Sequence, residues 1–258
     1  VQLVDTLTHC WYATCSSKRT LRYVEAFAGS AALYFALQPK RGLLIDINTR
    51  LQDCMNAVKA NPEEVHHYLS SIPGDEATYY QMRSLLSANY NQSQRAAQFI
   101  YLNRYCFNGL YRTNSAGQFN VPYGGSRNGQ IPTRDQLKLA SEALSRADIV
   151  SGDFASVISA RVQKTDFVYL DPPYASKNAN LDNQYGPDVF GARDIDRLYS
   201  TVELIERRGG KFVISYADCA EIEQFAERWA TYKVQVKRTI AANSAKRSSA
   251  SELLITNI

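Results

Sequence analysis

The first sixty residues alternate between apolar runs and short turns. Five segments have strand, turn, helix, strand and helix character in that order: RYVEAF (22–27), AGSA (28–31), ALYFAL (32–37), GLLI (42–45) and the stretch from Leu51 to Val58. The second strand ends at the polar residues Asp46-Ile47-Asn48. A strand, a small-residue turn, a helix and a strand that ends in an acid together predict the opening βαβ unit of a nucleotide-binding sheet.

The expected role of this unit follows from its geometry. The amino terminus of the first helix would face a ligand, and Asp46 could accept hydrogen bonds from two ribose hydroxyls. FAGSA (27–31) lacks the second glycine of the usual fingerprint, so the glycine pattern alone is a weak signal. A helix cap is the alternative role for Asp46.

The pattern changes after the second helix. Apolar residues recur at helical spacing from about 62 to 107, and the chain then becomes polar and rich in turn residues from Tyr111 to Arg134. Asn-Ser-Ala-Gly at 114–117 lies between strand-like residues and predicts the tip of a β-hairpin. This region has the character of a helical insertion that carries a hairpin.

Strand character returns in the second half of the chain. The expected strands are 148–153, 167–170, 211–215, 234–240 and 252–257, of which the last two are expected to pair as a hairpin. EIEQFAERWA at 221–230 predicts an amphipathic helix before that hairpin. We therefore expect an α/β sheet domain interrupted by an arginine-rich helical insertion.

The strand at 167–170 runs directly into DPPY (171–174). Proline cannot donate to a sheet ladder and pushes the preceding residue toward extended backbone, so the strand should end at Asp171. Its carboxylate and the following carbonyls would then project from the carboxyl edge of the sheet, where open α/β sheets bind ligands. A plain strand-terminating turn is the alternative.

Composition excludes several classes of protein. The chain has 258 residues, 45% hydrophobic and 21% charged, which is typical of a globular α/β protein. It has no uncharged apolar run near the length of a membrane span. Its five cysteines are scattered without a C-x-x-C pair and there are three histidines, so we expect no disulfide framework, no metal site and a cytoplasmic protein.

Positive charge is concentrated in two stretches that lack Asp and Glu. The first, 91–134, also lacks Lys and holds five arginines: Arg95, Arg104, Arg112, Arg127 and Arg134. The second, 228–251, holds six basic residues. Acid-free stretches in a chain with 25 acids suggest a surface that meets phosphate, although a solvated basic face is the alternative.

Five motifs occur in one order along the chain. They are VEAFAGS (24–30), LLIDIN (43–48), NRYCFNGLYRTNSAGQFNVPYGG (103–125), SGDF (151–154) and DPPY (171–174). In this order the chain closely resembles the Dam family of DNA N6-adenine methyltransferases, and its GATC-modifying members in particular, from about residue 20 to the end. NGLYR followed by FNVPYGG is the most specific part of the resemblance.

The resemblance implies a Rossmann-like S-adenosylmethionine-dependent methyltransferase sheet. Residues 1–54 and 146–258 would form the catalytic and cofactor-binding domain, and 55–145 the mostly helical DNA target-recognition domain with its hairpin. The implied cofactor-binding residues are Glu25 beside the methionine moiety, Phe27 and Gly29 along the cofactor, Asp46 and Ile47 at the ribose, Asp153 and Phe154 at the adenine, and Asp171. Glu25 could instead be an exposed strand residue. A glycine often occupies the position of Ala31 in this family.

The same resemblance gives DPPY a chemical role. The N6 lone pair of adenine is delocalised into the ring, whereas a methyl group on a sulfonium is already a strong electrophile. Catalysis therefore has to localise that lone pair and align it with the methyl group. Asp171 and the carbonyl of Pro172 would accept the two N6 hydrogens, with Pro173 completing the turn, and Tyr174 would stack on a base flipped out of the duplex.

The hairpin region is expected to bind double-stranded DNA. By the resemblance, Arg112 reads guanine through its O6 and N7 atoms, Phe107 wedges into the base stack, and Leu110 and Pro122 make apolar contacts. The other implied DNA-binding residues are Asn108, Asn114, Arg95 and Arg127. For the arginines outside the hairpin, phosphate contacts and surface salt bridges remain equally open.

Two points of the resemblance stay open. Members of the family carry a W-x-G-G-K type segment upstream of their first helix, and VQLVDTL at the start of this sequence aligns with that helix, so we expect that an amino-terminal stretch precedes it. The alternatives to a GATC adenine methyltransferase are a cytosine-N4 or RNA amino-methyltransferase of the same fold, or a DNA-binding relative without methyl transfer. We expect a monomer, and the sequence does not distinguish a solitary enzyme from a restriction-modification partner.

Overall fold

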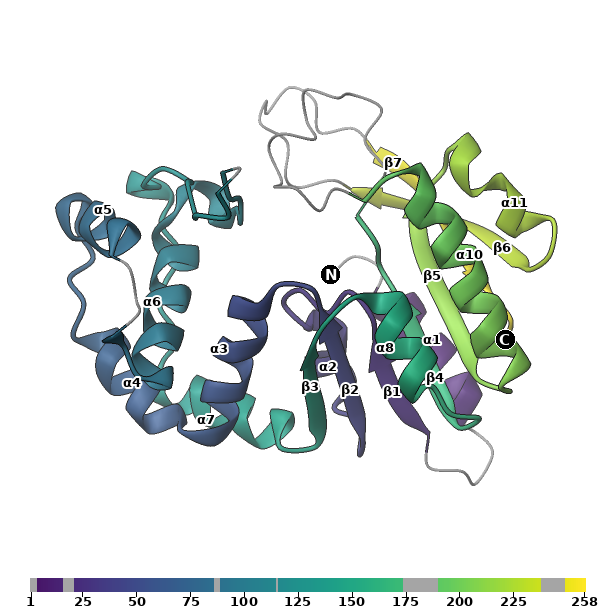
Figure 1. Ribbon diagram of the computed structural model, residues 1–258, viewed down its shortest axis with the longest axis horizontal. Helices are drawn as coiled ribbons and strands as arrows, with labels where there is room; N and C mark the ends of the chain where they lie inside the picture. The colour runs from purple at the N-terminus through teal and green to yellow at the C-terminus, as the bar shows by residue number, and fades with distance from the viewer. Residues whose placement is uncertain (1–3, 16–20, 86–88, 115, 174–189, 238–248) are drawn as a thin grey trace. The chain divides into compact units, whose positions relative to one another are not determined.

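The computed structural model describes residues 4–15, 21–85, 89–114, 116–173, 190–237 and 249–258 (Figure 1). These residues fall into two compact units. The first contains the chain up to Ile47 and most of the chain from Arg146 onward, and the second contains Asn48–Ser145.

Seven strands of the described residues form one sheet, in the order β3-β2-β1-β4-β5-β7-β6. The strands are β1 (Arg22–Glu25), β2 (Gly42–Asp46), β3 (Ala147–Ser151), β4 (Asp166–Leu170), β5 (Lys211–Ala217), β6 (Ala230–Lys237) and β7 (Ser249–Thr256). The first five are parallel, and β7 is antiparallel to both β5 and β6. This is the predicted open α/β sheet, and its fold class is confirmed.

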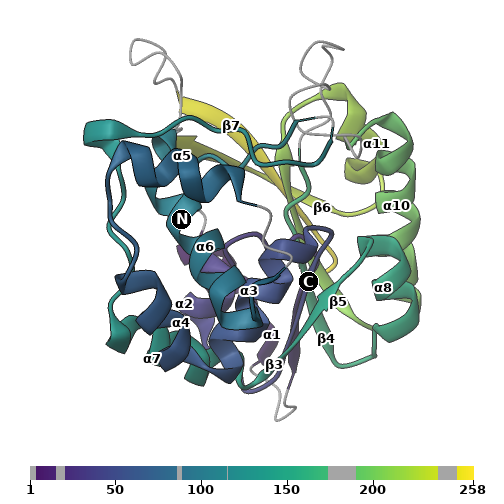
Figure 2. The same cartoon turned by 60° about the vertical axis from the view of Figure 1, so that its left-hand side comes forward.

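Helices cover both faces of this sheet (Figures 1 and 2). One face carries α8 (Phe154–Arg161) and α10 (Ala192–Arg207), and the other carries α1 (Val4–Cys15) and α2 (Ala32–Leu37). Successive side chains of a strand point to opposite faces of the sheet, and Val24, Val168 and Ile214 belong to the core under α8 and α10. On the opposite face, Trp11 of α1 packs against Tyr23 and Phe167.

The second unit is built from helices. They are α3 (Thr49–Ala60), α4 (Pro62–Ser70), α5 (Glu76–Ser84), α6 (Gln92–Tyr105) and α7 (Arg134–Leu144), with short 3-10 turns η2 (Phe107–Gly109) and η3 (Gly125–Arg127). Their core includes Leu69, Tyr79, Tyr101 and Leu102, and it also holds Val121 of the hairpin region. The Tyr79 hydroxyl donates to the Val121 carbonyl at 2.9 Å, so the hairpin is fixed to the helices.

The predicted helix at 221–230 is wrong in extent. The chain forms only a 3-10 turn η4 (Ala220–Ile222) and a short α11 (Glu223–Ala226), and β6 already begins at Ala230. Trp229 is buried against Phe225 and Phe212, and its indole Nε1 donates to Glu206 at 3.1 Å. The chain turns at residues 227–229 and enters β6, and these contacts of Trp229 fix the turn where local periodicity favours a continued helix. The predicted antiparallel pairing of the last two strands is confirmed, while residues 238–240 lie outside the described residues.

A buried ion pair joins the starts of β1 and β4. Arg22 donates from Nε to Asp166 Oδ1 at 3.0 Å and from an NH2 group to Oδ2 at 2.7 Å. The same guanidinium donates to the Arg161 carbonyl, and Asp166 also accepts from the Gln163 amide. Because both charges are buried and paired by two hydrogen bonds, loss of either partner leaves an uncompensated charge.

Replacing Asp166 by Ala should therefore lower the free energy of unfolding by about 3–5 kcal/mol, measured by urea denaturation. Asp218→Ala is the matched control, since it breaks the exposed pair with Lys233 in the same unit and should cost less than about 1 kcal/mol. Equal losses in the two variants would contradict the structural role of the buried pair.

Candidate functional site

The loop after β1 is fastened to the end of β2. The Gly29 amide donates to Asp46 Oδ2 at 2.9 Å, and the Ala28 amide donates to the Ile45 carbonyl at 2.8 Å. Gly29 has a φ of 48°, a left-handed conformation that glycine adopts without strain. Asn48, not Asp46, caps α3, so the alternative role of Asp46 as a helix cap is wrong.

Ala31 also adopts a left-handed backbone, with a φ of 52°. Its methyl group is buried where α2 begins. An L-residue in this conformation costs about 1–2 kcal/mol, which explains why a glycine suits this position. The loop thus adopts this left-handed backbone with an alanine at position 31.

Glu25 closes β1 with a buried carboxyl group that is 4% exposed. It accepts a hydrogen bond from the Tyr23 hydroxyl at 3.1 Å. Burial raises the pKa of Glu25 to about 8, although the hydrogen bonds from Tyr23 and from the Tyr34 amide oppose this. Because Glu25 is buried, the alternative of an exposed strand residue is wrong.

Three aromatic rings cluster beside this loop. Phe27 lies 4.9 Å from Phe154 and 5.9 Å from Phe190, measured between ring centroids. Phe190 precedes α10 and is remote in sequence from the two predicted residues, so no local pattern indicated it. Ile47, which we also predicted at this site, is 58% exposed.

Asp153 caps α8 and accepts a hydrogen bond from the Ser156 amide at 3.0 Å. It also forms an ion pair with Arg197 of α10 at 2.5 Å. Partial burial alone would raise the pKa of Asp153, but the hydrogen bonds and charge of Arg197, together with those from Ser156, hold it below its usual value. No local sequence pattern indicated this ion pair, because Asp153 and Arg197 lie far apart in the chain.

Asp171 follows the last residue of β4, as the proline argument predicts. The residue is exposed overall, yet its carboxyl group lies against Ser215 of β5, whose hydroxyl donates to Oδ1 at 2.7 Å. Desolvation raises the pKa of Asp171, and the Ser215 hydrogen bond opposes the rise. Pro172 is buried and Pro173 exposed, while Tyr174 lies outside the described residues.

The predicted hairpin is present in the second unit. Thr113 and Phe119 form an antiparallel bridge, and the Asn114 amide donates to the Gln118 carbonyl at 2.9 Å. The Asn114 side chain accepts from the amides of Ala116 and Gln118, which fixes the turn. On the adjoining strand, Arg112 donates from Nε to Asn120 Oδ1 at 3.0 Å, so its guanidinium is held on the hairpin.

The turn before the hairpin carries the other predicted contact residues. Asn108 has a φ of 56°, and Leu110 is 41% exposed. The Phe107 amide donates to the carbonyl of the exposed Pro122 at 2.9 Å, so the two sides of the hairpin base are joined. Arg127 stacks over the Phe107 ring, with 5.2 Å between its Cζ and the ring centroid.

The remaining predicted arginines differ in their contacts. Arg95 donates to the Tyr90 carbonyl, and Arg134 forms an exposed ion pair with Glu63. Arg104 is exposed, and its carbonyl accepts from the Gly129 amide at 2.7 Å. A surface salt bridge therefore accounts for Arg134.

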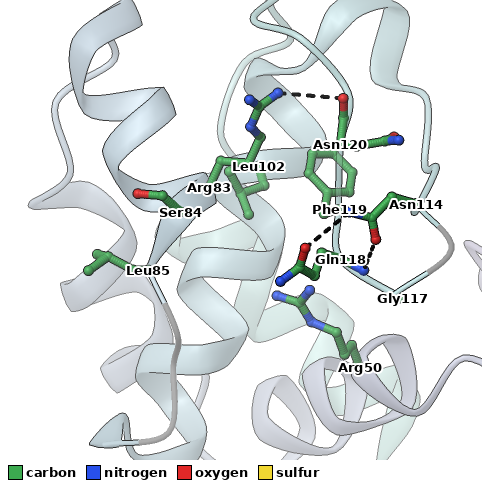
Figure 3. Close-up of a pocket in the computed structure, with 10 residues that line it drawn as sticks. All are labelled: Arg50, Arg83, Ser84, Leu85, Leu102, Asn114, Gly117, Gln118, Phe119 and Asn120. Carbon is green, nitrogen blue, oxygen red and sulfur yellow. Dashed lines mark hydrogen bonds between the residues drawn. The ribbon is translucent and has the colours of Figure 1, made fainter.

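A polar cavity of about 600 Å³ lies between the hairpin and the helices of the second unit (Figure 3). The Arg50 and Arg83 side chains line it together with Asn114, Gln118 and Asn120. Arg83 also donates to the Val121 carbonyl at 3.0 Å, which ties α5 to the hairpin. The sequence analysis did not single out Arg50 or Arg83, because each lies on a helix far from the hairpin in sequence.

The first unit thus brings Glu25, Asp46 and Asp171 to the carboxyl ends of β1, β2 and β4. Strand order reverses between β1 and β4: β2 and then β3 extend the sheet on the side of β1, and β5 extends it on the side of β4. A crevice at such a switch point is the usual ligand site of an open α/β sheet. Within the described residues there is no helix long and apolar enough to cross a membrane, and no group of three or more His, Cys, Asp or Glu side chains suited to a metal ion.

Comparisons with known proteins give consistent results. A type II methyltransferase of Methanocaldococcus jannaschii is 34% identical over 257 residues, which cover 92% of this chain and 88% of the relative. A type II methyltransferase of Lactococcus lactis subsp. cremoris is 31% identical over 245 residues, covering 91% and 86%. The DNA adenine methylase of Escherichia coli is 30% identical over 236 residues, covering 90% and 84%.

A solved structure, a precorrin-6y methyltransferase of Geobacter metallireducens, matches with a TM-score of 0.36 and 10% identity over 97% of this chain and 86% of its own, a likeness too slight to support a conclusion. The sequence model of the D12 class of N6 adenine-specific DNA methyltransferases, in contrast, matches residues 7–240. The match spans β1 to β6 of the sheet and the whole helical unit with its hairpin. The chain belongs to the D12 class N6 adenine-specific DNA methyltransferase family.

Proposed function

We propose that this protein transfers a methyl group from S-adenosylmethionine to adenine N6 in duplex DNA, at GATC sites, with the target base flipped out of the helix. The observation that carries the proposal is the position of Asp171 and Pro172 at the end of β4, beside the loop that Asp46 fastens at the end of β1. Two hydrogen-bond acceptors that suit an amine thus lie at the same edge of the sheet as a nucleotide-binding loop.

The residues at this edge fit S-adenosylmethionine. The left-handed Gly29 presents no side chain at the loop, so the backbone can approach a ligand there. A carboxylate has about four acceptor positions, and the Gly29 amide uses one on Asp46, so the ribose hydroxyls suit the same group. Phe27, which is partly exposed and packs on the buried Phe154 and Phe190, offers aromatic surface for an adenine ring.

Glu25 suits the methionine end of the cofactor. A buried carboxyl group whose pKa is about 8 loses its proton readily when a cation approaches, because an opposite charge favours the ionised form. The ammonium group of the methionine moiety is such a cation. Asp153 can take part in adenine binding only together with Arg197, to which it is paired.

The protein has to align adenine N6 with the methyl group and to localise the lone pair of that nitrogen. The cofactor, when bound, supplies a methyl group on a positively charged sulfur. Asp171 and the Pro172 carbonyl accept one N6 hydrogen each, which draws the nitrogen lone pair out of the ring and directs it outward. The bond that forms between N6 and the methyl carbon would replace the carbon–sulfur bond, whose electrons would stay on sulfur, and the surplus N6 proton would pass to Asp171 and on to water.

The adenine has to leave the duplex to reach this edge. Unstacking and unpairing cost a few kcal/mol, which stacking and hydrogen bonds in the pocket offset. We assign the stacking role to Tyr174, which follows the two prolines in the chain. Phe107 is the candidate that fills the space left in the stack.

DNA recognition is assigned to the hairpin. Arg112 is held by Asn120 on a hairpin fixed to helices, so its guanidinium is preorganised for a bidentate contact with guanine. Leu110 and Pro122 are exposed on the same turn region, where apolar contacts to bases are possible. We assign contacts with the DNA backbone and with the base pairs beside the site to Arg95, Arg127, Asn108 and Asn114.

Replacing Asp171 by Ala should abolish methyl transfer and leave the fold intact, because the change removes an acceptor at an exposed strand end. The measurement is mass spectrometry of nucleosides from methylated duplex DNA. Asp148→Ala, which removes an exposed acid on β3, serves as the control and should keep N6-methyladenine formation. Formation of N4-methylcytosine by the unchanged protein would contradict the adenine assignment.

Asp46→Ala should weaken S-adenosylmethionine binding roughly ten-fold or more, since hydrogen bonds to a charged group contribute about 1.5–3 kcal/mol. Calorimetry on the variant, with Asp148→Ala again as the control, measures this. An unchanged dissociation constant would remove Asp46 from the site.

Arg112→Ala should relax discrimination at one base pair, because a bidentate arginine–guanine contact is worth about 1–3 kcal/mol. The comparison is with Arg127→Ala, each assayed on GATC and on sites changed at one position. Because Arg127 is assigned to the DNA backbone, Arg127→Ala should lower activity on every sequence alike. A uniform loss on every site for Arg112→Ala would mean that Arg112 does not read the sequence.

A further inference from the structure

A chain of hydroxyl groups supports Asp171 from inside the sheet. The Tyr169 hydroxyl lies 2.9 Å from the Ser215 Oγ, and Ser215 Oγ lies 2.7 Å from Asp171 Oδ1. Ser215 is 1% exposed and Tyr169 is 6% exposed, so both hydroxyls are shielded from bulk water. The pairing of β4 with β5, in which Leu170 lies opposite Ile214, brings the three side chains together.

The chemistry of the three groups fixes the direction of these hydrogen bonds. An ionised carboxylate only accepts, so the single Ser215 proton goes to Asp171. The Ser215 oxygen is then left as an acceptor toward Tyr169, and the Tyr169 hydroxyl is the donor. Tyr169 thereby prevents Ser215 from turning its proton away from the carboxylate.

We propose that Ser215 and Tyr169 are positioning residues for Asp171: they fix one carboxylate oxygen so that the other has a defined direction toward the adenine amine. Neither residue belongs to the DPPY motif. The inference rests on the proposed role of Asp171. With Oδ1 held at 2.7 Å, rotation of the carboxylate about its Cβ–Cγ bond is restricted, and the alignment that methyl transfer requires is preorganised.

The surrounding charges make this support necessary. Desolvation and the negative charge of Glu252 on β7 both raise the pKa of Asp171, and Asp171 in turn raises the pKa of the buried Glu25 on β1. The Ser215 hydroxyl, and the Tyr169 hydroxyl that supports it from behind, act in the opposite direction. Removing them should leave Asp171 protonated over a wider range of pH, and a protonated carboxyl is a poorer acceptor for the amine.

The test uses the full chain with Ser215→Ala and Tyr169→Phe. Ser215→Ala should lower single-turnover methyl transfer about ten-fold or more and move the acid limb of the pH–rate profile upward by about one pH unit, since a hydrogen bond to a charged group is lost. Tyr169→Phe should move the limb in the same direction by less, because Ser215 still donates. The dissociation constant of S-adenosylmethionine should not change.

Thr256→Val is the matched control. It removes another buried hydroxyl of the sheet, which donates to the Phe212 carbonyl at 2.6 Å, and it should leave the pH profile in place. A merely structural role for Ser215 would give the two variants the same profile.

A second readout separates this inference from the proposed function. The carboxyl carbon of Asp171, labelled with carbon-13 and assigned by its loss in Asp171→Asn, should titrate at higher pH in Ser215→Ala than in the unchanged protein. Identical titration curves and identical pH–rate profiles would overturn the positioning role while the methyltransferase assignment stands. Absence of methyl transfer by the unchanged protein would instead overturn the proposed function, and the titration would still decide whether Ser215 controls Asp171.

Discussion

The parallel pairing of β1 with β4 is the constraint on which the rest of the site depends. Its register begins with Arg22 opposite Asp166, whose buried ion pair fixes the start of both strands, and continues to Glu25 opposite Tyr169. The loops that leave these strands lead to opposite sides of the sheet, because strand order reverses at this pair. Asp46 and Asp171 follow neighbouring parts of this reversal, at the edge where open α/β sheets usually bind ligands.

The same pairing places several polar groups where burial is costly. Desolvation raises the pKa of both Glu25 and Asp171, and the charge of Asp171 adds to the rise in the pKa of Glu25. Hydroxyl groups from Tyr23 and Ser215 offset part of this cost. A sheet selected for stability alone would place apolar side chains here, so the buried carboxyls mark this edge of the sheet as a candidate functional site.

Much of this arrangement follows from local sequence patterns. The βαβ opening, the strand that ends at Asp171 and the hairpin tip at 114–117 were predicted, because strand alternation, proline geometry and turn residues act over a few neighbours. The contacts of Phe190, Arg197 and Ser215 were not, since each depends on packing between segments far apart in the chain. The helix predicted at 221–230 failed for the same reason: the burial of Trp229 overrides local periodicity.

Hydrogen exchange of the full chain with and without S-adenosylmethionine, in the absence of DNA, tests the central claim that the switch point between β1 and β4 binds the cofactor. The account predicts slower exchange in peptides that contain Gly29, Asp46 and Asp153, with residues 107–123 of the hairpin region unchanged. Protection confined to residues 107–123, or no protection around Gly29 and Asp46 at saturating cofactor, would contradict it.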